Sequence, residues 1–140
     1  MTSMATSEVV FPPAARYTGV DISAGKNVDI VLKDASRWSE LADAQFDVVI
    51  SGNTIEHVCD VYAWFKEMSR ILKAGGFFYI TAPSGTGNVS GVTVQLHRYP
   101  VDCWRFMEDG LRFLVEKVAG LKVLECYCSI KDIVVIGRKE

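Results

Sequence analysis

The stretch of sequence that decides the fold reads Phe46-Asp47-Val48-Val49-Ile50-Ser51-Gly52-Asn53-Thr54-Ile55-Glu56-His57-Val58. Its first half is apolar without regular polar alternation, which is typical of a strand buried on both faces of a parallel sheet. Its second half begins at Gly52-Asn53, where the chain leaves the strand. Ligands of open α/β sheets bind outside the carboxyl ends of the strands. We therefore expect a central strand that runs into a functional loop.

Shorter elements are expected on the amino-terminal side of this strand. Tyr17–Ile22 and Val28–Leu32 have the composition of short strands, and turn-forming residues separate them. Ser36–Leu41 has a helix-capping serine and predicts a short helix. The chain therefore alternates between strands and a helix before it reaches the central strand.

The alternation continues on the carboxyl-terminal side. Asp60 opens a helix that Gly75-Gly76 ends, and its apolar residues recur at helical spacing: Val61, Trp64, Phe65, Met68, Ile71 and Leu72. Phe77–Thr81 follows as another buried strand. Next come a loop rich in glycine and serine at Ser84–Gly91 and a second amphipathic helix at Asp109–Val118.

The last two elements are the strands Lys122–Ser129 and Asp132–Gly137, which a short connection joins into an antiparallel hairpin. Alternating strands and helices imply a mostly parallel sheet with helices on both faces. We therefore predict an α/β protein with a Rossmann-like, doubly wound sheet that closes in a C-terminal antiparallel hairpin.

The composition is that of a single globular domain. The chain has 140 residues, 49% of them hydrophobic and 23% charged, which is enough apolar material for one core. Residues 1–16 are polar and contain Pro12-Pro13, so we expect a flexible N-terminal arm followed by one domain at residues 17–140.

Charge and cysteine usage restrict the partners. The net charge of −2 and the pI near 5.7 argue against a nucleic-acid partner. No apolar run approaches the roughly 18 residues of a membrane span, and the amino terminus does not resemble a secretory signal. The four cysteines lack the spacing of a disulfide framework or a zinc site. We expect reduced thiols, no metal, no membrane association and a cytoplasmic location.

Several segments, in this order, resemble one known family. They are Tyr17–Ser23, Lys33–Ala35, Phe46–Val58, Ile71–Gly76 (with Ala74 in place of a usual proline) and His97–Leu111. Together they resemble the class I S-adenosylmethionine-dependent methyltransferases over roughly Tyr17 to Lys139. The resemblance implies the same α/β fold, S-adenosylmethionine as cofactor and methyl transfer to a small molecule that the sequence does not identify.

The resemblance also implies a set of cofactor-binding residues. Asp21, with Ile22 beside it, ends the strand whose acidic residue binds the ribose hydroxyls, and a carboxylate offers two acceptors to a vicinal diol. Asp34 and Ala35 occupy the loop that faces the adenine amino group. The cofactor would be lined by residues where the chain leaves the central strand: Ser51, Gly52 and Asn53.

The candidate catalytic residues are His57, His97 and Tyr99, which the resemblance places on the substrate side. Methyl transfer mainly requires alignment of nucleophile and methyl group, so a base is optional; His57 or His97 would serve if one is needed. For His57 an alternative stays open, in which the imidazole orients its loop through hydrogen bonds. Around His97 the polar set that includes Arg105 suits either an anionic substrate or a buried ion pair.

The chain departs from the family at its amino terminus. The first strand and the glycine-rich loop that lets the backbone approach the cofactor are missing before Tyr17. Either Val9-Val10-Phe11 stands in for that strand, another chain supplies it, or the sheet closes differently. We therefore expect a homo-oligomer or a partner chain that covers the missing strand. The alternative function is a non-catalytic binding or assembly module that has lost cofactor binding.

Overall fold

The structure is a computed structural model of the chain, and it describes residues 15–84, 86–89, 92–95, 101–129 and 131–140. Residues 1–14 of the predicted arm, which include Val9-Val10-Phe11, lie outside these ranges. The boundary between an arm at residues 1–16 and a domain at residues 17–140 therefore stays a prediction.

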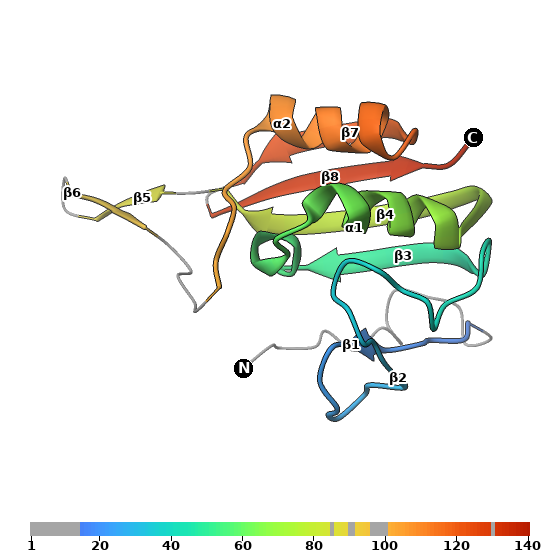
Figure 1. Ribbon diagram of the computed structural model, residues 1–140. Coiled ribbons are helices and arrows are strands. Elements are labelled where there is room, and N and C mark those ends of the chain that lie inside the picture. Colours follow the sequence, from blue (N-terminus) through green and yellow to red (C-terminus); the bar gives the residue numbers. More distant parts are fainter. Residues whose placement is uncertain (1–14, 85, 90–91, 96–100, 130) are drawn as a thin grey trace.

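The described strands form three sheets, and the helices α1 and α2 lie on one face of the largest sheet (Figure 1). In chain order the elements are β1 (Val20–Asp21), β2 (Ile30–Val31), β3 (Phe46–Gly52), the 3-10 helix η2 (Ile55–His57), α1 (Val61–Ile71), β4 (Leu72–Pro83), β5 (Thr86–Val89), β6 (Val92–Gln95), α2 (Glu108–Phe113), the π-helical turn η3 (Leu114–Val118), β7 (Lys122–Cys128) and β8 (Asp132–Arg138).

The largest sheet has four strands in the order β3-β4-β8-β7. β3 and β4 are parallel and are connected through α1, whereas β8 runs antiparallel to both of its neighbours. β1 and β2 form a separate parallel pair, which lies on the side of β3 away from β4 (Figure 1). The predicted α/β class, the parallel pairs and the C-terminal antiparallel hairpin are confirmed.

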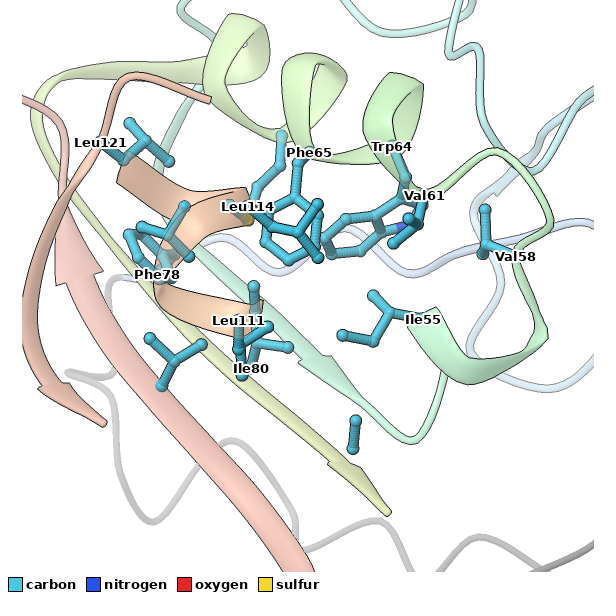
Figure 2. Close-up of a cluster of buried hydrophobic side chains, with 14 of the residues drawn as sticks. Ile55, Val58, Val61, Trp64, Phe65, Phe78, Ile80, Leu111, Leu114 and Leu121 are labelled. Atoms are coloured by element: carbon cyan, nitrogen blue, oxygen red, sulfur yellow. The ribbon is translucent and has the colours of Figure 1, made fainter. Parts of the chain in front are cut away.

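The hydrophobic core lies between the four-stranded sheet and the helices on one of its faces (Figure 2). Phe65 and Met68 of α1 and Leu111 of α2 are fully buried against Phe78 and Ile80 of β4. Helix α1 begins where the sequence predicts it. The Asp60 carboxylate caps the helix, because it accepts the backbone N–H of Ala63 at 3.0 Å. Both described α-helices therefore cover the same face, although the sequence predicts helices on both.

The opposite face of the sheet is apolar and exposed over its β3-β4 half. Val48 and Ile50 are 39% and 56% exposed, and their partners in β4, Phe77 and Tyr79, are 46% and 38% exposed. The prediction that β3 and β4 are buried on both faces is therefore wrong. The physical reason is that, among the described residues, no strand pairs with the outer side of β3 and no helix covers this face.

The predicted helix at Ser36–Leu41 is also wrong. These residues form turns, with an isolated bridge between Asp34 and Arg37. Tertiary hydrogen bonds replace the helical ones, because the Trp38 N–H donates to the Glu67 carboxylate at 2.9 Å. The Arg70 guanidinium donates to the carbonyls of Trp38 and Leu41, each at 2.8 Å. Polar groups on α1 therefore hold this loop in a non-helical conformation.

Other differences are smaller. The predicted strands at Tyr17–Ile22 and Val28–Leu32 are two residues long in the structure, and α1 passes directly into β4 before Gly75-Gly76 is reached. The predicted loop Ser84–Gly91 contains β5, which pairs antiparallel with β6. In the part of the chain that the structure describes, no helix has the length and apolar character needed to cross a membrane.

Candidate functional site at the carboxyl ends of the strands

Asp21 lies where the sequence places it, at the carboxyl end of β1. Its backbone carbonyl accepts the N–H of Leu32 at 2.8 Å, and its carboxylate Oδ1 accepts the N–H of Ser23 at 2.9 Å. The second bond forms a tight turn that fixes the carboxylate at the strand end. Asp21 is exposed, as is its neighbour Ile22 at 59%. The acid is thus available to a ligand at this edge.

Asp34 and Ala35 lie in the loop after β2. The Asp34 carboxylate accepts the N–H of Ser36 at 2.7 Å, in a turn of the same kind as that at Asp21. The carbonyl of Ala35 accepts Nε1–H of the buried Trp38 at 2.9 Å. The loop therefore has an exposed acid on one side and an indole anchor on the other.

Arg70 on α1 is the centre of the network that positions this loop. Besides the carbonyls of Trp38 and Leu41, its guanidinium binds the carboxylates of Glu67 at 2.7 Å and Asp43 at 2.6 Å. The hydrogen bond from Arg70 lowers the pKa of the Glu67 carboxyl. The sequence does not reveal this network, because its members are up to 32 residues apart and form no motif.

Ser51, Gly52 and Asn53 form the carboxyl end of β3 and the turn that follows it. The N–H of Asn53 donates to the carbonyl of Thr81 in β4 at 2.9 Å. Asn53 has a φ of 49°, a left-handed conformation that asparagine adopts more readily than most residues. A Cβ added at Gly52 would meet Oγ1 of Thr81 at 3.5 Å, an ordinary contact. The backbone therefore turns sharply at the edge where ligands of parallel sheets bind.

Glu56 and His57 lie in η2, directly after this turn. Glu56 is fully buried, and its Oε1 lies 3.5 Å from Nε2 of His57. The Nδ1 atom of His57 lies at hydrogen-bond distance, 3.0 Å, from the carbonyl of Val101. The imidazole is half-buried between these two groups. This geometry favours the alternative in which His57 orients its loop.

Residues 101–104 contact η2 and the two residues that follow it. The carbonyl of Glu56 accepts the N–H groups of Cys103 at 2.7 Å and Trp104 at 3.2 Å. Nε1–H of Trp104 donates to the carbonyl of Val58 at 2.8 Å. Arg105 and Asp102 form a two-bonded ion pair at 2.5 and 2.7 Å. Of the two interpretations of the polar set around His97, an anionic substrate or an ion pair, this geometry corresponds to the ion pair.

The remaining predicted site residues lie outside the described residues: His97 and Tyr99. Of the others, the structure brings Ser51, Gly52 and Asn53 into one turn. It places Asp21 at the end of β1 and Asp34 after the neighbouring strand β2. Within the described ranges no group of three or more His, Cys, Asp or Glu side chains is arranged to hold a metal ion.

One parallel pair of strands carries Asp21 at the end of β1 and Asp34 after β2, and beside it β3 ends in the Gly52-Asn53 turn. This arrangement defines an α/β protein whose candidate ligand site lies at the carboxyl ends of these strands. The family can be stated as well. The profile of the methyltransferase domain family matches residues 3–80, more than half of the chain. The chain belongs to this family, and the resemblance seen in its sequence is confirmed.

Two curated relatives match the chain over about half of its length. A probable S-adenosylmethionine-dependent methyltransferase of Mycolicibacterium smegmatis is 36% identical over 70 residues, which are 50% of this chain and 24% of the relative. The dimethylglycine N-methyltransferase of Parasynechococcus marenigrum is 36% identical over 75 residues, which are 53% and 27%. The matched region thus spans about a quarter of each relative.

A solved structure supports the fold. The 1,6-didemethyltoxoflavin-N1-methyltransferase of Burkholderia thailandensis, solved with bound 1,6-didemethyltoxoflavin and S-adenosylhomocysteine, superposes with a TM-score of 0.60. It is 16% identical, and the match covers 87% of this chain and 60% of that enzyme. At this identity the likeness shows the fold alone.

Proposed function

We propose that the chain is an S-adenosylmethionine-dependent methyltransferase that transfers a methyl group to a small molecule. The observation that carries the proposal is the exposed Asp21 carboxylate, held at the carboxyl end of β1 in a chain of the methyltransferase domain family. The names of the two curated relatives agree with it, since both are methyltransferases.

The residues present fit an adenosine-containing cofactor. Asp21 offers carboxylate oxygens to a ribose diol, with the apolar side chain of Ile22 beside it. The carboxylate of Asp34 offers acceptors to an exocyclic amino group, and Ala35 contributes a small side chain. Around Gly52 the backbone is accessible because that position has no side chain, and Ser51 and Asn53 flank it.

The cofactor supplies a methyl group on a positively charged sulfur, which is already activated for transfer. The protein then has to orient the acceptor and exclude water. His57 holds residues 101–104 in place through Val101, so we assign it mainly to orientation of the acceptor side. We retain His97 and Tyr99 as substrate-facing residues, with His97 as the base if the acceptor requires one.

The negative net charge of −2 supports a small molecule, and not a nucleic acid, as the methyl acceptor. The spacing of the four cysteines, which matches no disulfide framework, supports a cytoplasmic location. We further propose that the exposed apolar face of β3 and β4 is covered by a second copy of this chain. Val48, Ile50, Phe77 and Tyr79 carry no charge, so an isologous contact between two such faces would bury no unpaired ion.

Calorimetric titration with S-adenosylmethionine and S-adenosylhomocysteine tests the proposed function. We expect micromolar binding to the wild-type protein. Asp21→Asn keeps an oxygen for the N–H of Ser23 but removes the charge, and we expect it to weaken binding about tenfold or more. Asp47→Asn is the matched control, because Asp47 is an exposed acid near the amino end of β3. Absence of binding at millimolar ligand would contradict the proposal.

A further inference from the structure

Two cysteines that are far apart in sequence lie together on the surface. Sγ of Cys59 is 3.2 Å from Sγ of Cys103, although 44 positions separate them. Both residues are exposed on the surface. The sequence gives no sign of this pair, because neither residue has a neighbouring cysteine or a metal-binding spacing.

The backbone on both sides holds the two thiols in place. Cys103 is fixed by its own N–H, which donates to the carbonyl of Glu56, and by the indole of Trp104, which donates to the carbonyl of Val58. Cys59 precedes Asp60, whose side chain caps α1. The hydrogen bond between the two thiols raises the pKa of Cys103. The contact is thus a property of two anchored segments.

We propose that Cys59 and Cys103 form a reversible intramolecular disulfide, which makes the pair an oxidative modification site. A disulfide joins its sulfur atoms at about 2 Å, so the two sulfurs have to approach by about 1 Å. Both cysteines are exposed and lie outside the helices and strands, so rotation of their side chains can provide this approach while the backbone stays anchored. The proposal is independent of the methyltransferase activity.

A peroxide is the oxidant in this reaction. One thiolate attacks the peroxide oxygen, which gives a sulfenic acid and releases water after protonation. The second thiolate attacks the sulfenic sulfur, the S–S bond forms and a second water leaves. Two thiols are thereby oxidised, and one hydrogen peroxide is reduced to two waters. Because thiolates react and the pKa of Cys103 is raised, the reaction accelerates as the pH rises.

The bond would tie residues 101–104 to the start of α1. The carbonyl of Val101, in the same segment, contacts Nδ1 of His57 in η2, so oxidation would also restrict the surroundings of this histidine. The other cysteines differ in their surroundings. Cys126 is buried, and burial raises its pKa, whereas Cys128 is exposed on β7. Cys128 therefore provides a control for unspecific oxidation of an exposed thiol.

Peptide mapping of the full chain after hydrogen peroxide treatment tests the proposal. We expect a cross-linked peptide pair containing Cys59 and Cys103 in the monomer, the loss of two hydrogen atoms in mass, and reversal by dithiothreitol. We also expect the oxidised protein to melt about 4 °C or more above the reduced protein, because the bond closes a long loop. Cys128→Ser should behave as the wild type does, whereas Cys59→Ser should give neither the cross-link nor the shift.

Three results would overturn the proposal. These are sulfinic or sulfonic acids at Cys59 or Cys103 without a cross-link, disulfide-linked dimers in place of the intramolecular bond, or an identical melting shift in Cys59→Ser. The mapping uses the wild-type chain, so it does not depend on the folding of any variant.

Discussion

Arg70 joins α1 to the loop that carries Asp34. Its guanidinium donates to two backbone carbonyls and to two carboxylates, and only 28% of its side chain is exposed. Arg70→Gln would leave the carbonyls of Trp38 and Leu41 without this donor. We expect a loss of about 2–4 kcal/mol in the free energy of unfolding, measured with urea. Lys66→Gln, an exposed change on the same helix, should cost less than about 0.5 kcal/mol. Equal effects would contradict the assigned role.

Glu67 makes the same network sensitive to acid. The hydrogen bond from Arg70 lowers the pKa of the Glu67 carboxyl below its usual 4.5 in the folded protein. Its contribution to stability is therefore complete above the usual pKa and is lost as the pH falls through the lowered one. We expect the wild type to lose more stability than Glu67→Gln between about pH 5 and about pH 3, by urea denaturation. Parallel pH profiles of the two proteins would contradict this.

At the scale of the elements, β8 packs between its neighbours without space for an extra methyl group at Gly137. A Cβ there would collide with the carbonyl oxygen of Lys122 in β7 and with the ring of Phe78 in β4. We expect Gly137→Ala to cost about 2 kcal/mol or more in the free energy of unfolding. Gly110→Ala in α2 is the control, because a Cβ there meets open space and alanine favours a helix. It should be neutral or stabilising.

The sequence predicts those elements best whose signals are local. α1 and the terminal hairpin follow from helical spacing, the Asp60 cap and two β runs, and all of them are confirmed. The helix at Ser36–Leu41 fails because Glu67 and Arg70 bind its backbone from 29 to 32 positions away. The strand ends of the candidate site were predicted from Asp21 and Gly52-Asn53, whereas the packing of residues 101–104 on η2 depends on long-range contacts that no pattern shows.

At the scale of the whole molecule, one apolar face of the four-stranded sheet is exposed to solvent. Val48, Ile50, Phe77 and Tyr79 form a continuous apolar strip over β3 and β4. We expect a dimer in sedimentation experiments at micromolar protein, because burial of this strip against a second copy is favourable. Ile50→Lys should shift the dimer toward the monomer. Tyr62→Lys, at an exposed aromatic on α1, should leave the oligomeric state unchanged. A wild-type monomer would contradict the second-copy proposal.

In the proposed function, a methyltransferase cofactor binds where the strands end. Amide chemical shifts during titration with S-adenosylhomocysteine test it most directly. We predict saturable shifts of the Gly52 and Asn53 amides, with little change at Gly75, which lies near the amino end of β4. Shifts confined to Gly75 and its surroundings, or no shifts at millimolar ligand, would contradict the account.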